Sequence, residues 1–268
     1  SFGNNSDVKF DNLVTAQHAT PHHGNALVNG TLNTNPTVYW RLDEPVGATA
    51  RDSSGSFNGT YYAPAGMLAL GAPGPRPSDG VYAMNEANLA PTASGQAGGV
   101  EYTSLSTTAG IPTGSYSYQM WFNSSVSNWS DETLQYLFTR ANSTENSDRR
   151  DAVYIGGNHN AAADRGKLAL MSGGSTSVTF GNRVLDPNRW YHLTYVRNDY
   201  EDPENPGTML GDVKLYLNGK LEITSTDPWQ TGTGNYFTAG NRTDRHPSLG
   251  LKGQFDEVVL WDRPLGEA

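Results

Sequence analysis

The sequence contains no cysteine, which excludes disulfide bonds, thiolate metal sites and a cysteine nucleophile. It contains no run of about 18 apolar residues, so no segment is predicted to span a membrane as a helix. Lys and Arg number 18 against 27 Asp and Glu, and the net charge of −9 argues against a nucleic-acid partner. Phosphate-binding loops, HExxH motifs and Gly-x-Ser-x-Gly elbows are also missing.

Turn-forming and aromatic residues are abundant instead, with 30 Gly, 15 Pro, 14 Tyr and 6 Trp. Short segments with alternating apolar residues recur along the chain, and Asn218-Gly219 in LYLNGKLEI is a strong β-hairpin signal. Strands are predicted at residues 37–43, 58–64, 80–85, 98–104, 115–125, 134–141, 152–157, 167–172, 175–181, 189–198, 212–224, 235–241 and 254–261. No helical stretch of ten residues is evident. This pattern predicts an all-β fold, a two-sheet antiparallel jelly-roll sandwich.

Residues 1–36 are polar and are predicted to be a linker or the tail of a preceding domain. KFDNLV near the start and QFDEVV near the end share one pattern. Residues 1–14 therefore contain either the last strand of a preceding domain or a first strand that pairs with the last one. The chain begins at Ser1 rather than Met, which indicates a processed or excised piece of a longer protein.

VYWRLDEPVGATARDSSGSFNGTY (38–61) resembles the opening of laminin G-like jelly-roll domains in the concanavalin A-like lectin/glucanase superfamily. SYSYQMWFNSS, RWYHLTYVRN with VKLYLNGKLE, and GQFDEVVLWDRPL follow in the order that the family shows. The resemblance covers residues 37–265 and implies one such domain over residues 37–268. It specifies the fold and no particular ligand.

Asp256 and Glu257 stand side by side at the entrance of the last predicted strand. Retaining glycosidases of the superfamily place their carboxylates on one strand as Glu-x-Asp-x-x-Glu, which this sequence lacks. Adjacent strand residues point to opposite faces, so Glu257 is expected to face away from Asp256 and to pair with Arg263 or Lys252. The Gln-x-His strand of similar polysaccharide lyases is also missing. We therefore expect no catalytic activity.

The resemblance implies a calcium ion where the first and last strands meet. Calcium prefers six to eight hard oxygen ligands. The predicted side-chain ligands are Asp256, Asp52, Asn58 and Glu44. Structural alternatives remain open, because Asp52 is also suited to cap its own Ser-Ser-Gly turn and Glu44 to pair with Arg41 or Arg51.

Sugar binding requires exposed aromatic rings beside amides and carboxylates. Trp129 and Trp229 lie in loop-like contexts and are the predicted ligand-binding aromatics, unless they fold over a sheet edge. Trp40, Trp121 and Trp190 are expected at core positions.

Two further clusters are expected to be solvated. His18, His22 and His23 have a spacing that suits a transition metal, but they lie in the predicted linker. The segment 198–212 holds five acidic residues and interrupts a predicted hairpin, so it is either a solvated insertion or a second cation site.

The sequence thus predicts a non-catalytic binding module, with carbohydrate as its first candidate ligand and calcium as its cofactor. The module is expected in a secreted or cell-surface protein, and the lack of cysteine favours a bacterial one, since extracellular animal relatives usually carry a disulfide. The first alternative is an adhesion or spacer domain of a tandem array that binds protein or no ligand. The second is a polysaccharide-cleaving enzyme of the same fold.

Overall fold

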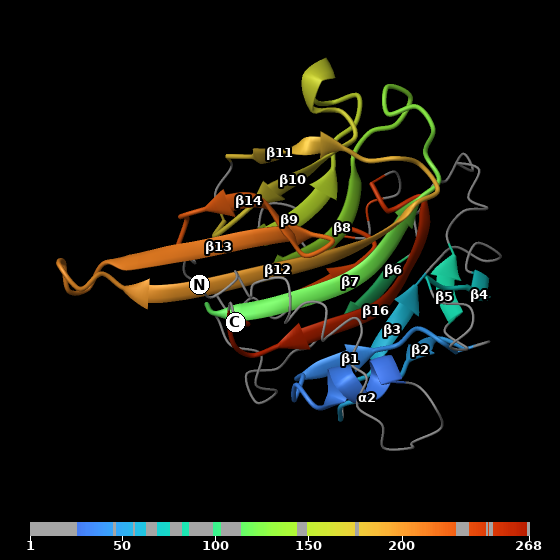
Figure 1. Cartoon of the computed structure of the whole chain (residues 1–268), viewed down its shortest axis with the longest axis horizontal. Helices are drawn as coiled ribbons and strands as arrows, with labels where there is room; N and C mark the ends of the chain where they lie inside the picture. Colours follow the sequence, from blue (N-terminus) through green and yellow to red (C-terminus); the bar gives the residue numbers. More distant parts are fainter. Residues whose placement is uncertain are drawn as a thin grey trace, which may run out of the picture.

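The structure is a computed structural model. It describes residues 26–44, 47–55, 57–62, 69–75, 82–85, 99–102, 114–143, 149–174, 177–228, 236–244, 246 and 249–266. Two antiparallel sheets of eight strands each lie one behind the other (Figure 1). The two-sheet jelly-roll sandwich predicted from the sequence is therefore confirmed. None of the helices in the described ranges is long and apolar enough to cross a membrane.

The front sheet, the one nearer the viewer in Figure 1, has the order β14-β13-β12-β7-β16-β5-β4, and β1 pairs with β16. Its strands are β1 (Val38–Trp40), β4 (Ala69–Pro73), β5 (Tyr82–Asn85), β7 (Tyr116–Ser124), β12 (Trp190–Glu201), β13 (Met209–Leu217), β14 (Lys220–Ser225) and β16 (Gly253–Trp261). Asn218 and Gly219 join β13 to β14 with φ values of 51° and 75°. This is the backbone that a two-residue hairpin turn requires, so the Asn-Gly prediction is confirmed.

The back sheet has the order β11-β10-β9-β8-β15-β6-β3-β2. Its strands are β2 (Thr49–Ala50), β3 (Gly59–Tyr62), β6 (Gly99–Tyr102), β8 (Gln135–Ala141), β9 (Arg149–Ile155), β10 (Lys167–Met171), β11 (Thr179–Val184) and β15 (Tyr236–Ala239). The helical segments in the described residues are α2 (Ala26–Leu32) and a 3-10 turn, Ala162–Asp164.

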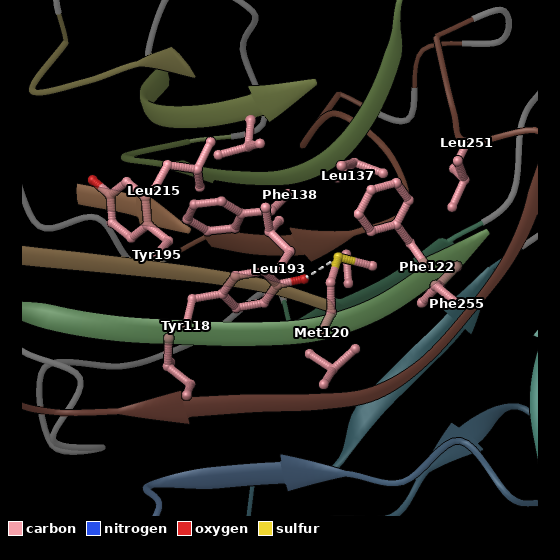
Figure 2. Close-up of a cluster of buried hydrophobic side chains, with 14 of the residues drawn as sticks. Tyr118, Met120, Phe122, Leu137, Phe138, Leu193, Tyr195, Leu215, Leu251 and Phe255 are labelled. Carbon is pink, nitrogen blue, oxygen red and sulfur yellow. Dashed lines mark hydrogen bonds between the residues drawn. The ribbon is translucent and has the colours of Figure 1, made fainter. Parts of the chain in front are cut away.

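The core lies between the two sheets and is rich in aromatic rings (Figure 2). Tyr118, Met120 and Phe122 project into it from β7, because alternate residues of a strand share one face. Tyr118 stacks on Phe138 of the back sheet with ring centroids 4.5 Å apart. Each fully buried side chain of this size contributes about 1.5–3 kcal/mol, so these rings are a major source of the stability of the sandwich.

Charged side chains also lie in the interior, where β7, β9 and β12 face each other. Asp151 and Arg197 are both fully buried and form an ion pair of 2.8 Å. The Asp151 carboxylate also accepts hydrogen bonds from the Tyr116 hydroxyl (2.6 Å) and the Gly173 amide (2.9 Å). Arg197 Nη1 donates in addition to Asp199 Oδ1 at 2.8 Å. This interior network ties the front sheet to the back sheet.

Helix α2 packs on the outer face of the front sheet. Val28 and Leu32 from the helix contact a buried outer cluster. The cluster comprises Tyr39, Val196, Tyr216, Val259 and Trp261. Trp261 Nε1 donates a 2.9 Å hydrogen bond to Thr34 Oγ1. Residues 26–36, part of the predicted linker, therefore pack against the domain, whereas residues 1–14 lie outside the described residues.

The acidic segment 198–212 is mostly strand rather than loop. Asn198–Glu201 pairs in register with Met209–Asp212 as a two-stranded ribbon, which extends beyond the rest of the front sheet (Figure 1). Its acidic side chains close the turn, since Asp202 Oδ1 accepts from the Glu204 amide and Glu201 Oε1 accepts from the Gly207 amide. The extended solvated insertion expected from the sequence is thus reduced to the turn at residues 202–208.

Candidate functional site on the outer face of the front sheet

The outer face of β7 carries polar side chains at the centre of the front sheet. Because Tyr118, Met120 and Phe122 point into the core, Gln119 and Trp121 point outward. Gln119 lies opposite Thr194 and Trp121 lies opposite His192 on β12. On the other side, Trp121 lies opposite Asp256 on β16. These five side chains, Gln119, Trp121, His192, Thr194 and Asp256, form the outer patch.

The side chains of the outer patch are almost fully buried, except for the tryptophan. Gln119, Thr194 and Asp256 are 1%, 0% and 0% exposed, whereas Trp121 is half-buried. The Trp121 ring lies against the His192 ring with centroids 4.9 Å apart and a 53° tilt. Trp121 is therefore the side chain of the patch that is most accessible from solution.

Four buried polar atoms of the outer patch have no hydrogen-bond partner in the structure. They are Gln119 Oε1, Trp121 Nε1, Thr194 Oγ1 and Asp256 Oδ2. Each unsatisfied buried group costs about 1–3 kcal/mol of stability, and native proteins satisfy the large majority of such groups. Residues paired across strands lie about 4.5–5.5 Å apart at their Cβ atoms. The patch therefore gathers unmet donors and acceptors within the span of one small ligand.

A β-bulge places the two adjacent carboxylates together. The pairing of β16 with β7 shifts between Asp256 and Val259, and Glu257 has a φ of 52°. Phe255 and Val258 both reach the core, so Asp256 and Glu257 occupy the interval between two inward residues. The extra residue of a bulge breaks the alternation of a strand. The expectation that alternation separates the two carboxylates is therefore wrong.

Glu257 has a different partner from the bases expected. Its Oε2 accepts a hydrogen bond from the Tyr39 hydroxyl, and its amide donates to Asp256 Oδ1 at 2.9 Å. Lys252 instead pairs with Glu132, and the Arg263 guanidinium donates to the backbone carbonyl oxygens of residues 34 and 35.

Burial raises the pKa of the Asp256 carboxyl well above its usual range, and the charge of Glu257 raises this pKa further. Burial also raises the pKa of the Tyr39 hydroxyl, with Glu257 adding to the shift. Asp256 therefore keeps its proton to a higher pH than an exposed aspartate does. A protonated carboxyl both donates and accepts hydrogen bonds, so Asp256 has the same versatility as a hydroxyl group.

The predicted calcium ligands Asp52 and Asn58 serve a turn. Asp52 Oδ1 accepts from the Tyr39 and Ser54 amides at 2.9 Å, and Oδ2 accepts from the Phe57 amide at 3.0 Å. Asn58 Oδ1 accepts from the Asp52 amide at 2.9 Å. The alternative role of Asp52, capping its own turn, is present in the structure.

Glu44 lies beside the same turn, and both of its carboxylate oxygens are occupied. Oε1 accepts from the Arg51 amide at 2.7 Å and Oε2 from the Tyr61 hydroxyl at 2.5 Å. Asp256 lies on β16, and its charge acts on Tyr61, whose hydroxyl donates to Glu44. Within the described ranges, no three His, Asp or Glu side chains are grouped to hold a metal. Asp52, Asn58 and Glu44 have hydrogen-bonding roles in this structure, and calcium at these residues and Asp256 stays a prediction.

The tryptophans are distributed differently from the expectation. Trp40 is in the core as predicted, but Trp121 and Trp190 are half-buried and outside the core clusters. Trp129 folds over the core edge, where its ring packs so closely on Gly166 that a Cβ there would lie 2.5 Å from it. Its predicted role in ligand binding stays a prediction.

Four residues singled out in the sequence, Trp229, His18, His22 and His23, lie outside the described residues.

Sequence reasoning missed the outer patch although the signal was present. Gln119 and Trp121 alternate with the core residues of β7, and His192 and Thr194 alternate with Leu193. The phase of this alternation, once fixed by the core residues, identifies the outward side chains.

Comparisons with known proteins agree with this architecture. The family model of the concanavalin A-like lectin/glucanases superfamily matches residues 97–268. Domain 4 of AbnA, an extracellular arabinanase from Geobacillus stearothermophilus in complex with arabinotriose, has a TM-score of 0.57 at 18% identity, covering 87% of this chain and 95% of that one. The search of curated proteins produced no match.

Two further solved structures are similar at lower identity. Trypanosoma rangeli sialidase in complex with 2,3-difluorosialic acid has a TM-score of 0.59 at 10% identity over 87% of this chain, which spans only 31% of the sialidase. The ligand-binding domain of botulinum neurotoxin serotype D, in complex with N-acetylneuraminic acid, has a TM-score of 0.55 at 11% identity, covering 90% of this chain and 50% of that one. At these identities the likeness concerns the fold.

Proposed function

Because the chain belongs to the concanavalin A-like lectin/glucanases superfamily, we propose that it is a non-catalytic carbohydrate-binding module whose site is the outer patch. The observation that carries the proposal is the set of four unpartnered polar atoms around Trp121. Sugars present apolar ring faces and hydroxyl groups that donate and accept hydrogen bonds. A tryptophan beside unmet donors and acceptors is complementary to both features.

Each patch residue has a distinct part in the proposed binding. Gln119 Oε1 accepts a hydrogen bond from a sugar hydroxyl, and Trp121 Nε1 donates one. Thr194 and protonated Asp256 do either. These groups are unsatisfied in the free protein and lower its stability. Hydrogen bonds to a ligand would remove this penalty, which favours binding.

Ligand access is expected at the half-buried rim of the patch. Asn123 and Gln254 lie opposite each other in the pairing of β7 with β16, next to Trp121, and all three side chains are half-buried. The four unpartnered atoms themselves are buried. Binding therefore requires rim side chains to move, and such a step lowers association rates.

The arrangement of the carboxylates supports binding rather than cleavage. Glycosidases use two carboxyl groups that flank the scissile bond. Here Asp256 contributes an oxygen to the patch, whereas Glu257 accepts the Tyr39 hydroxyl and is linked to Asp256 through its amide. The adjacent pair does not present two carboxyl groups from opposite sides of one bond.

The similar structures support a sugar as the ligand. The arabinanase domain is in complex with arabinotriose and the neurotoxin domain with N-acetylneuraminic acid. The arabinanase is described as extracellular. We propose that the present module belongs to a secreted or cell-surface protein, and the lack of cysteine favours a bacterial one. An adhesion or spacer role is the alternative if no glycan binds.

A glycan array followed by calorimetry tests the proposal. Trp121→Ala is expected to weaken binding of the best array ligand at least about tenfold, a loss of about 1.4 kcal/mol. Trp129→Ala is the comparison variant, because its ring lies on the core edge rather than in the outer patch. Circular dichroism establishes that both variants fold.

If Trp129→Ala lost binding and Trp121→Ala retained it, the binding site would lie outside the outer patch. A complete lack of binding across the array would favour the spacer role.

A further inference from the structure

We infer that the outer patch takes neutral glycans and rejects those that carry a carboxylate, an inference that rests on the proposed function and names the class of its ligand. Hydroxyl groups satisfy the four unpartnered atoms, whereas an anionic group would meet the carboxylate of Glu257 beside Asp256. This preference depends on the charged groups that surround Asp256 and on the partners of the arginines in this region.

Acidic groups outnumber basic ones around Asp256. Glu257 follows it in the bulge, and the electrostatic neighbours of Asp256 are Glu257, Arg41 and Asp43. The neighbouring strand β7 contributes the uncharged Gln119, Trp121 and Asn123, and β5 has the sequence YAMN. His192 lies on β12, one strand further away. Among these electrostatic neighbours in the described residues, Arg41 carries the positive charge.

Arg41 is already engaged with an acid. Its Nη1 pairs with Asp43 Oδ2 at 2.9 Å. Arg197, which projects from β12 into the interior, pairs with Asp151 and Asp199. Proteins recognise carboxylates through charge-assisted hydrogen bonds, above all with arginine. Arg41 Nε is buried without a hydrogen-bond partner, but the charge of Arg41 is already balanced by Asp43, and a glycan carboxylate would add a further negative charge beside Glu257.

The ligands of the similar structures represent the two classes. Arabinotriose is neutral, whereas N-acetylneuraminic acid carries a carboxylate at neutral pH. The amide of Gln119, the indole of Trp121 and the hydroxyl of Thr194 suit the hydroxyl groups of the first class. The acid of the second class would lie near Glu257, where like charges in a poorly solvated site repel.

Matched glycan pairs test the inference with the intact protein. The probes are lactose against 3′-sialyllactose, and methyl-esterified against de-esterified polygalacturonan, measured by calorimetry at pH 7 alongside the glycan array. The neutral member of a pair is expected to bind at least tenfold more tightly. Equal or tighter binding of the acidic member would overturn the inference and leave the proposed function intact. A failure of every glycan to bind would overturn both.

Two variants connect the preference to the residues named. Asp43→Asn frees Arg41, and Glu257→Gln removes the carboxylate next to Asp256. Either change is expected to reduce the neutral-to-acidic affinity ratio at least threefold, and the more exposed Asp43 position serves if Glu257→Gln fails to fold. An unchanged ratio in both variants would overturn the assignment.

Discussion

Two groups of buried polar side chains in this molecule differ in how completely they are satisfied. In the interior network, the Asp151 carboxylate accepts four hydrogen bonds, from Tyr116, Gly173 and two nitrogens of Arg197. In the outer patch, Gln119, Thr194 and Asp256 are as deeply buried but each retains a polar atom without a partner. The difference teaches that burial alone does not identify a structural role.

The two groups also differ in what they connect. The interior network joins β7, β9 and β12 and is complete without any ligand. The outer patch joins three neighbouring strands of one sheet, which the backbone ladder already holds together. Its polar atoms are therefore not required to hold the strands together, and a ligand would provide their hydrogen-bond partners.

The largest predicted effect is the removal of an acid from the interior network. Asp151→Ala leaves Arg197 buried without its main partner, which costs about 3–5 kcal/mol for a buried ion pair. Urea or guanidinium unfolding measures the loss. Asp212→Ala is the control, because Asp212 is about half exposed in its pair with Lys214, and exposed pairs contribute about 0–1 kcal/mol. Equal losses in the two variants would show that the network is not a major source of stability.

The next effect depends on pH and concerns the outer patch. The folded pKa of Asp256 is raised, so its contribution to stability is complete below the unfolded pKa of about 3.9. That contribution is lost as pH rises through the folded pKa. Asp256→Asn is therefore expected to be increasingly more stable than the wild type as pH rises above about 4. Thermal unfolding from pH 4 to 9 measures the difference, and a difference independent of pH would contradict the buried, proton-holding state.

A smaller effect distinguishes two threonines that are equally buried. Thr194 Oγ1 has no partner, whereas Thr139 Oγ1 donates to the backbone carbonyl of Asn241 at 3.3 Å. Thr194→Val is expected to stabilise the protein by about 1 kcal/mol, and Thr139→Val to destabilise it by about the same amount. Chemical unfolding measures both. Losses of similar size in the two variants would remove the distinction between patch and interior.

Removal of calcium is expected to have the smallest effect. The oxygens of Asp52 and Glu44 already accept hydrogen bonds within the protein. A chelator should therefore leave the thermal midpoint within about 1 °C, whereas a site filled at a hundredfold excess over Kd would contribute about 2.7 kcal/mol. A drop in the wild type that is lost in Asp256→Ala would instead establish Asp256 as a ligand of the ion.

Much of the fold could be predicted because its determinants are local. The alternation along β7 and the Asn218-Gly219 turn specify strands and a hairpin without knowledge of their neighbours. Strands β2 and β4 were missed because they carry little apolar alternation and depend on pairing. The ribbon formed by β12 and β13 was missed because acidic residues that suggest a solvated loop also close a tight turn.

The site was less predictable, for reasons that lie in specific residues. The bulge at Glu257 requires a positive φ, which a glutamate in the sequence does not predict. The bulge also changes the direction in which the two carboxylates point. The unmet hydrogen-bonding capacity of Gln119 and Thr194 is a property of their surroundings in three dimensions. Only the alternation around Trp121 could have placed that ring outside the core.

The central position of β16 has a consequence for the order in which the molecule assembles. This strand pairs with β7, β5 and β1, yet it follows every other described strand in the sequence. During synthesis on the ribosome, β1 and β7 therefore lack the strand that joins them, and the backbone edges that pair with β16 remain without partners. Contacts between distant parts of a chain slow folding. We expect this domain to complete its folding after β16 has been synthesised, and to interact with chaperones until then.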